Sequence, residues 1–233
     1  GGIAKGSGMI HPNMGTMLCY LTTDCAISPE MLKKALKTAC GVTFNRISVD
    51  GDTSTNDSLI ILANGLAGNP EIVSEGEDFM TFTAALTELC TEMARKMAAD
   101  GEGARHLITC TVSGAADEKE AETMAKAVIS STLTKAAIFG CDANWGRVLC
   151  AMGYSGVEFD PNSVDITFKS AAGIVPVCKN GMGLEFDEKM AKKALSEPEV
   201  EILAAMGSGA GQATCWGCDL TYDYVKINGD YRT

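Results

Sequence analysis

The strongest candidate for a reactive residue in this chain is Thr16, which follows a glycine and precedes an apolar segment. Residues 5–15 are rich in glycine and hold one proline, which predicts an exposed loop. From Thr16 the sequence turns apolar, and residues 17–21 are expected to form a buried strand. If the Gly15–Thr16 bond is cut, Thr16 presents a hydroxyl nucleophile together with its own α-amine as a base. On its own, however, a Gly-Thr pair before a strand is more often a structural turn.

The residues around this pair make the hypothesis more specific. Residues 5–18 read Lys-Gly-Ser-Gly-Met-Ile-His-Pro-Asn-Met-Gly-Thr-Met-Leu. This order resembles the autoprocessing segment of the ornithine acetyltransferase family, the glutamate N-acetyltransferases of the cyclic arginine pathway, with Gly15 where the family usually has alanine. The resemblance implies that the chain is cut before Thr16 and that Thr16 carries the acetyl group. It also implies that Lys5, eleven residues earlier, contacts substrate, and a compact ammonium suits an amino-acid carboxylate.

Glu102 is a second candidate, and it lies between two glycines. It follows a helix expected over residues 77–99 and precedes a strand expected over residues 107–112. A lone glutamate just past a helix end is usually solvated, but flanking glycines would let it point into a cleft. The order Asp-Gly-Glu-Gly-Ala at residues 100–104 also resembles the family's placement of its substrate-contacting glutamate. The resemblance implies that Glu102 meets the positively charged amine of an amino-acid substrate.

The end of the sequence carries a third set of candidates. Residues 227–233 read Ile-Asn-Gly-Asp-Tyr-Arg-Thr and resemble the family's ending, Ile-Asn-Ala-Asp-Tyr-Arg-Thr/Ser. The resemblance implies that Asn228 and Thr233 contact substrate. The alternation of apolar residues and tyrosines over residues 220–227 predicts a closing strand before them.

Three other segments could be mistaken for ligand sites. Residues 50–57 pack three acids and several hydroxyls around one glycine, but they lack the glutamate at the twelfth position of an EF-hand. A capped turn is the simpler interpretation, whereas the resemblance favours a wall of the active site. Cys215 and Cys218 have no second pair to complete a structural zinc site. The glycines at residues 207–211 lack the ending of a phosphate loop, so we expect a bulge or hairpin there. We therefore predict no bound metal.

Composition excludes several classes of function. The net charge is −11 and the pI is near 4.6, which disfavours nucleic acid and anionic membranes as partners. No apolar run approaches a membrane span of about 20 residues, and no signal-peptide pattern opens the sequence. The ten cysteines lie within apolar runs, so we expect reduced core residues in a cytoplasmic protein.

Alternating strands and amphipathic helices predict an α+β fold with mixed layers. The resemblance makes this the layered α/β sandwich of the ornithine acetyltransferases and the DmpA-type aminopeptidases, a fold of the N-terminal-nucleophile type. We expect residues 1–15 to be the end of an upstream α chain with its autoprocessing loop. Residues 16–233 are then the catalytic β chain, with a subdomain boundary near 115–160. The sequence also begins within a motif and without methionine, as expected for the downstream part of a precursor.

The resemblance implies acetyl transfer from N-acetylornithine to glutamate through acetyl-Thr16, without a bound cofactor. Acetyl-CoA is left open as a second acetyl donor. The expected assembly is an α/β heterodimer or heterotetramer with the upstream α chain, which holds the family's oxyanion donors. Three alternatives stay open. They are an N-terminal-nucleophile amidase or aminopeptidase, a specialised-metabolism acetyltransferase with another acceptor, and an assembly half with the Gly15–Thr16 bond uncut.

Overall fold

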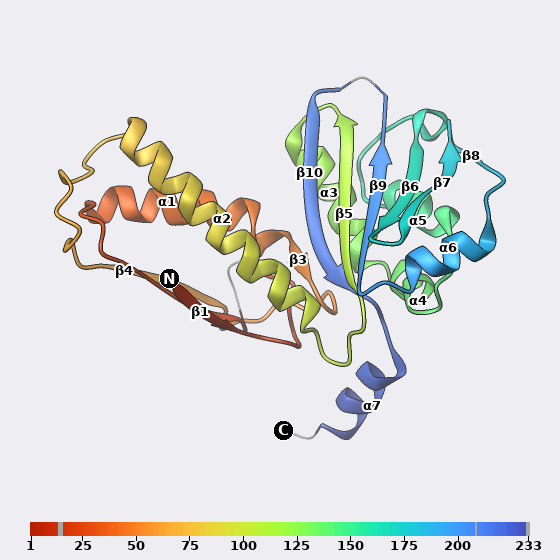
Figure 1. Cartoon of the computed structure of the whole chain (residues 1–233), viewed down its shortest axis with the longest axis horizontal. Helices are drawn as coiled ribbons and strands as arrows, with labels where there is room; N and C mark the ends of the chain where they lie inside the picture. Colours follow the sequence, from red (N-terminus) through yellow and green to blue (C-terminus); the bar gives the residue numbers. More distant parts are fainter. Residues whose placement is uncertain (14–15, 208, 232–233) are drawn as a thin grey trace. The chain divides into compact units, whose positions relative to one another are not determined.

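A computed structural model of the chain describes residues 1–13, 16–207 and 209–231 (Figure 1). The chain divides into two compact units, Gly1–Met97 and Ala98–Thr233. This division lies earlier than the interval 115–160 in which we expected a boundary. The long helix α2 (Glu77–Ala99) completes the first unit, and the next regular element, strand β5 (Leu107–Ala115), already belongs to the sheet of the second.

The first unit is a small sheet covered by two helices on one face. Strand β2 lies in the centre, antiparallel to β1 and parallel to β4. Cys19 of β2 is buried close to Cys40 of α1 and Cys90 of α2, so this face of the sheet packs against both helices. The elements of the unit are β1 (Gly2–Lys5), β2 (Leu18–Thr23), α1 (Pro29–Val42), a 3-10 turn (Phe44–Arg46), β3 (Ile47–Ser48), β4 (Ser58–Ala63) and α2.

The helices of this unit begin where the sequence signals them. Ser28 caps α1 by accepting a hydrogen bond from the amide of Met31 at 3.3 Å, and Pro29 fills the first helical position. Helix α2 spans the residues expected for the longest helix. Its Phe79, Leu86 and Met97 are buried on one face, as the spacing of its apolar residues requires.

The second unit is a larger mixed sheet with the strand order β10-β5-β9-β6-β7-β8. Strands β5 and β9 are parallel, and the other neighbouring pairs are antiparallel. The strands are β5, β6 (Asp165–Ser170), β7 (Gly173–Lys179), β8 (Met182–Gly183), β9 (Glu199–Ala205) and β10 (Gly211–Cys218); the helices are α3 (Glu118–Ser130), α4 (Thr132–Phe139), α5 (Trp145–Gly153), α6 (Glu188–Leu195) and α7 (Tyr222–Asp230), with a 3-10 turn at Pro161–Ser163 (Figure 1).

The core of the second unit lies between this sheet and the helices. Ile108, Cys110 and Val112 of β5 are fully buried, whereas Thr109 and Thr111 between them are half-buried. This alternation of period two places the apolar face of β5 against the helices. The facing side chains come from α3, α5 and α6, and they include Met124, Val128, Val148, Met152, Ala191 and Leu195.

One expectation for the second unit was wrong, and of the bulge or hairpin expected at residues 207–211 only the bulge is supported. Residues 222–230 form helix α7 rather than a closing strand. Thr221 caps this helix by accepting the amide of Tyr224 at 3.2 Å, and capping outweighs an alternation of only a few residues. The strands that flank residues 207–211 do not form a hairpin, because β9 and β10 both pair with β5. A register shift typical of a bulge does occur at Gly211 and Gln212.

No helix in the described part of the chain is long and apolar enough to cross a bilayer. All ten cysteines lie in the described ranges, and none of them is paired in a disulfide.

Candidate functional site

Thr16 lies directly before β2, at the point where the chain enters the sheet. Its hydroxyl oxygen is buried and has no hydrogen-bond partner in the structure as described. The next residue, Met17, is held through both of its backbone groups. Its amide donates to Asp57 Oδ1 at 2.7 Å, and its carbonyl accepts the amide of Ser58 at 2.8 Å. Gly15, on the other side of the expected cut, lies outside the described residues.

The loop of residues 50–57 fastens the chain on both sides of this position. Asp50 accepts the amides of Met9 at 2.7 Å and Ile10 at 3.1 Å. The Thr53 hydroxyl donates to the carbonyl of His11 at 2.9 Å, and Asp57 then holds Met17. The loop thus packs along the segment that holds Thr16. It is also a capped turn, since the amide of residue 52 donates to Asp50 Oδ1 at 3.3 Å.

Asp57 has an unusual environment for a carboxylate. Only 9% of its surface is exposed, and its Oδ2 is buried without a partner among the described residues. Burial raises the pKa of Asp57 above its ordinary value, and the hydrogen bond from the Met17 amide opposes that rise. A buried oxygen that lacks a partner is costly, so it points to a role in chemistry or ligand binding.

Lys5 lies on β1, opposite Leu18 of β2 in the register of the two strands. It is therefore on the strand beside β2, which begins two residues after Thr16. Lys5 is exposed and forms no ion pair within the described ranges, so its ammonium can meet a carboxylate brought by a ligand.

Glu102 and Asn228 lie together in the second unit, although 126 positions separate them in sequence. The Asn228 side-chain amide donates to Glu102 Oε2 at 2.8 Å and to the carbonyl of Tyr224 at 3.1 Å. The second carboxylate oxygen of Glu102 has no bond to a described residue. It can therefore accept a hydrogen bond from an ammonium. Thr233, the other candidate of this segment, lies outside the described residues.

The approach of α7 to the turn that holds Glu102 depends on Gly103. This glycine has a φ of +69°, and a Cβ there would lie 2.6 Å from the amide nitrogen of Tyr224. The Thr221 hydroxyl donates to the carbonyl of Gly103 at 2.7 Å. Only glycine combines this backbone conformation with such a close approach, so Gly103 allows Asn228 to reach Glu102.

The buried carboxylate of Asp219 binds the residues that follow this turn. Asp219 accepts the amides of Arg105 at 2.8 Å and His106 at 3.0 Å, and its other oxygen lies 2.8 Å from His106 Nδ1. Burial alone would raise the pKa of Asp219, but hydrogen bonds from the His106 ring and from the two amides lower it below its ordinary value. Arg105 also forms an exposed ion pair with Asp223 of α7 at 3.1 Å.

Asp219 was not among the candidates from the sequence, and Asp57 was included only as part of the loop of residues 50–57. Asp57 could have been singled out, because it ends the acid-rich loop that follows the nucleophile strand. Asp219 has no local pattern around it, and its partners lie more than 110 positions away. The Cys215 and Cys218 side chains are buried on β10. No group of three or more His, Cys, Asp or Glu side chains in the described ranges is arranged to hold a metal ion.

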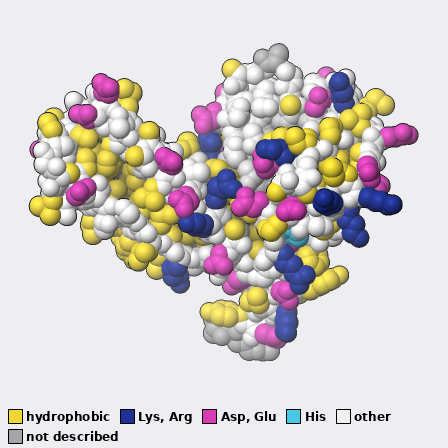
Figure 2. All heavy atoms as spheres, viewed as in Figure 1, with side chains coloured by type: hydrophobic (Ala, Val, Ile, Leu, Met, Phe, Trp, Pro, Cys, Tyr) yellow, Lys and Arg dark blue, Asp and Glu magenta, His cyan; other side chains and the backbone are white. Residues whose placement is uncertain are grey.

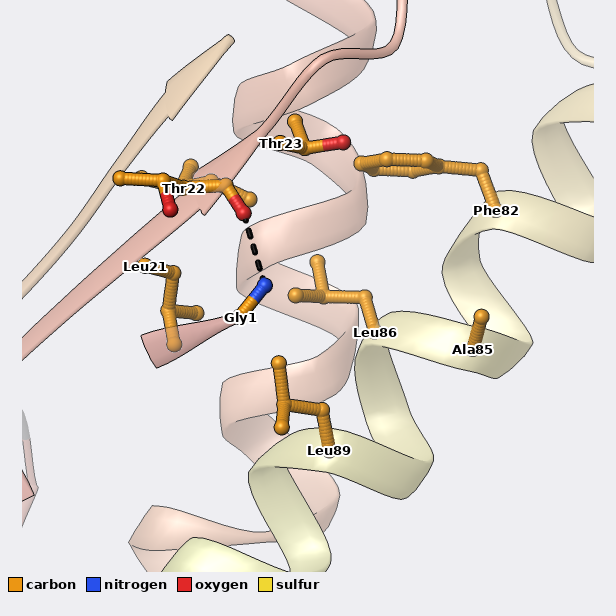
Figure 3. Close-up of a pocket in the computed structure, with 9 residues that line it drawn as sticks. Gly1, Leu21, Thr22, Thr23, Phe82, Ala85, Leu86 and Leu89 are labelled. Atoms are coloured by element: carbon orange, nitrogen blue, oxygen red, sulfur yellow. Dashed lines mark hydrogen bonds between the residues drawn. The ribbon is translucent and has the colours of Figure 1, made fainter. Parts of the chain in front are cut away.

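A cavity of about 190 Å³ lies elsewhere in the first unit, between β2 and α2. Figure 3 shows Leu21 on one side of it and Phe82, Leu86 and Leu89 on the other. None of the candidate site residues lines this cavity. Its walls are largely apolar, so it is not the site of the expected chemistry.

Comparisons with known proteins decide the family. The sequence profile of the ArgJ family matches residues 1–233. The chain belongs to the ArgJ family. It is 54% identical over 232 residues to "Arginine biosynthesis bifunctional protein ArgJ" of Thermotoga neapolitana, covering 100% of this chain and 58% of that protein. It is 53% identical over 231 residues to "Arginine biosynthesis bifunctional protein ArgJ 1" of Clostridium acetobutylicum, covering 99% of this chain and 57% of that protein.

A solved ArgJ structure shares the fold. The crystal structure of arginine biosynthesis bifunctional protein ArgJ from Bacillus halodurans superposes with a TM-score of 0.87 at 44% identity. The match covers 93% of this chain and 100% of that one. The expected α+β sandwich and the resemblance to the acetyltransferases of arginine biosynthesis are thereby confirmed. The chain spans a little under three fifths of the length of the ArgJ relatives named above.

Proposed function

We propose that this chain is the catalytic part of a glutamate N-acetyltransferase of arginine biosynthesis. It would transfer an acetyl group from N-acetylornithine to glutamate through acetyl-Thr16, after autoproteolysis between Gly15 and Thr16. The observation that carries the proposal is the buried, unpartnered hydroxyl of Thr16, next to a peptide that Asp57 and Ser58 hold in place. Membership of the ArgJ family, whose relatives are named for arginine biosynthesis, supports it.

The proposed reaction has two halves that share one covalent intermediate. The Thr16 oxygen attacks the acetyl carbonyl of N-acetylornithine while its α-amine takes the hydroxyl proton. The C–N bond of the substrate then breaks, ornithine leaves with that proton, and the acetyl ester remains on Thr16. In the second half glutamate, bound as an ammonium, loses one proton to solvent, and its uncharged amine attacks the ester carbonyl and passes a second proton to the leaving Thr16 oxygen. The C–O bond breaks, N-acetylglutamate is released and the Thr16 hydroxyl is restored.

The candidate binding residues supply opposite charges for an amino-acid substrate. Lys5 offers an exposed ammonium for a carboxylate. Glu102 offers a carboxylate for an ammonium, oriented by its hydrogen bond from Asn228. We assign Thr233 a further contact from the resemblance of the final residues. N-acetylornithine and glutamate both carry a carboxylate, which suits Lys5, and each carries a free amine, which suits Glu102.

We infer that the partner of this chain is the upstream α chain of the same precursor, in an α/β heterodimer or heterotetramer. Ile3, Tyr20 and Ile60 lie side by side across β1, β2 and β4, and all three are exposed, as is Leu62. Figure 2 shows hydrophobic side chains at the surface of this unit. An apolar sheet face of this kind favours a covering partner.

We expect the enzyme to work in the cytoplasm, and ten cysteines that form no disulfide support a reducing compartment. We also propose acetyl-CoA as a second acetyl donor, to be tested by its ability to acetylate Thr16. No cofactor is needed for acetyl transfer through a threonine ester.

The test is intact mass spectrometry of the full-length chain, before and after addition of N-acetylornithine and then of glutamate. We expect a fragment that begins at Thr16, gains one acetyl group and loses it to glutamate. A fragment that releases free acetate without glutamate would instead indicate an amidase. Loss of the acetyl group only to another amine would indicate a specialised acceptor, and a chain that is never cut would indicate an assembly role.

A further inference from the structure

The uncut chain faces a chemical problem that the α-amine of Thr16 cannot solve. Before cleavage the nitrogen of Thr16 is part of a peptide bond, and its lone pair is delocalised into the carbonyl group. It cannot act as a base. A threonine alcohol is a weak nucleophile unless a base removes its proton. Cleavage before Thr16 therefore needs a proton acceptor other than the one that serves the mature enzyme.

Asp57 is held directly beside the reacting residue. Its Oδ1 lies 2.7 Å from the amide nitrogen of Met17, and that nitrogen is bonded to the carbonyl carbon of Thr16. Asp57 Oδ2 and Thr16 Oγ1 are both buried, and neither has a partner in the described structure. Asp57 thus binds the amide of the Thr16–Met17 peptide, which is the peptide bond next to the reacting hydroxyl. A carboxylate oxygen can only accept a proton and a hydroxyl can donate one, so the two groups are complementary.

Other titratable groups of this region are already engaged or face solvent. Asp50 uses both of its oxygens for the amides of Met9 and Ile10. His11 Nδ1 lies 2.9 Å from the Ser48 hydroxyl. Asp52 is exposed, so it has no fixed position relative to Thr16. Asp57 is the carboxylate of this loop that combines burial with an oxygen unpartnered in the described ranges.

We propose that Asp57 is the general base of autoproteolysis and accepts the hydroxyl proton of Thr16 in the uncut chain. This inference rests on the autoproteolytic step of the proposed function. Burial also raises the pKa of Asp57. Its carboxylate is therefore a stronger base than that of an exposed aspartate. Rotation of the Thr16 side chain between staggered positions turns Oγ1 without a change in the backbone.

The step balances with one water molecule. Thr16 Oγ1 forms a bond to the carbonyl carbon of the preceding residue as its proton moves to Asp57. The C–N bond then breaks, and Asp57 returns the proton to the nitrogen, which becomes a free amine. Water hydrolyses the resulting ester, leaving a new carboxylate upstream and restoring the Thr16 hydroxyl. The free α-amine is then available as the base for acetyl transfer, and Asp57 is no longer required for proton removal.

The experiment follows cleavage in the full-length chain made by cell-free synthesis, with intact mass as the readout. Asp57→Asn keeps an oxygen for the Met17 amide and removes only the proton acceptor. We expect it to cut about 100- to 10,000-fold more slowly than wild type. Asp52→Asn makes the same change of charge in the same loop, and we expect its rate to stay within threefold of wild type. Thermal unfolding of each uncut variant shows whether it is folded.

Each outcome separates this inference from the proposed function. A wild-type chain that is cut, together with Asp57→Asn cut within threefold of its rate, would remove Asp57 as the base and leave the acetyltransferase intact. Equal slowing by Asp52→Asn would show a general effect of loop charge and would also overturn the assignment. Asp57→Glu packs less well but keeps a carboxylate, so it must cut faster than Asp57→Asn; the reverse order would contradict a base. A wild-type chain that is never cut would reject the processing step itself.

Discussion

The side-chain amide of Asn228 donates a hydrogen bond to the carboxylate of Glu102 at 2.8 Å, across 126 positions of sequence. The two residues belong to different elements, so no local structure brings them together. Glu102 lies in the turn before β5, and Asn228 lies on α7. Their contact depends on the packing of that helix against the turn, through Gly103 and Thr221.

Replacement of Glu102 tests its role toward the substrate amine. Glu102→Gln keeps the size and an acceptor oxygen but removes the charge, so the charge-assisted hydrogen bond to an ammonium is lost. We expect kcat/KM for glutamate to fall about 10- to 100-fold. The chain should still be cut before Thr16. A wild-type kcat/KM would show that this carboxylate does not meet the amine.

Two glycines near α7 should respond in opposite directions to the same substitution. Gly103→Ala forces a Cβ to 2.6 Å from the Tyr224 nitrogen at a φ of +69°, so we expect a loss of about 1–3 kcal/mol in the free energy of unfolding. Gly229→Ala meets nothing within 4 Å and lies in a helix, so we expect a gain of up to about 1 kcal/mol. Denaturant unfolding measures both, and equal effects would show that α7 does not pack as described.

Asp219 should contribute a stability that depends on pH. Its pKa is lower in the folded chain than its ordinary value of 3.8, so its contribution is complete above that value and is lost as the pH falls through the folded pKa. We expect Asp219→Asn to lose about 3 kcal/mol at neutral pH, with the gap to wild type narrowing below about pH 4. Urea unfolding across this range measures the gap, and a gap that is constant with pH would contradict the assignment.

Thr16 itself has a simple test. Thr16→Ala lacks the hydroxyl, so we expect no cut before residue 16 and no acetyl adduct. Thr16→Ser keeps a hydroxyl, and we expect it to be cut and acetylated at a reduced rate. Intact mass after incubation with N-acetylornithine distinguishes these outcomes. An acetylated Thr16→Ala chain would place the nucleophile elsewhere.

The thiols should differ sharply in reactivity. Burial raises the pKa of Cys19 and Cys40 to about 11, and burial with neighbouring thiols raises that of Cys90 to about 12. Cys150 is exposed. We expect iodoacetamide at pH 8 to alkylate Cys150 in the folded chain and to reach the other three only after unfolding. Peptide mapping of the alkylated protein checks this order, and early labelling of Cys90 would contradict the described core.

Much of this fold could be predicted from local sequence, because many of its elements carry their own signals. Helix α2 has a regular apolar face, and α1 and α3 begin at side chains that cap them. Helix α7 could not be found in this way, since its alternation of tyrosines and apolar residues imitates a strand. Its capping threonine also binds Gly103, which is 118 positions away.

Local sequence likewise indicated some of the candidate site residues and not others. Thr16 and Glu102 lie in distinctive local patterns, so the sequence indicated both. Asp57 and Asp219 act through partners that lie 40 or more positions away. Ordinary aspartates in polar turns are common, and only burial distinguishes these two. Burial is a property of the folded chain, and no short window of sequence reports it.

The position of α7 has a consequence for the synthesis of the enzyme. Because Asn228 reaches Glu102 from a helix that begins at Tyr222, a nascent chain that stops before this helix can complete the sheet of its second unit but lacks the paired carboxylate and amide. Products of stalled translation, or of proteolysis near residue 220, would therefore hold every strand of this sheet but lack the hydrogen bond from Asn228 to Glu102.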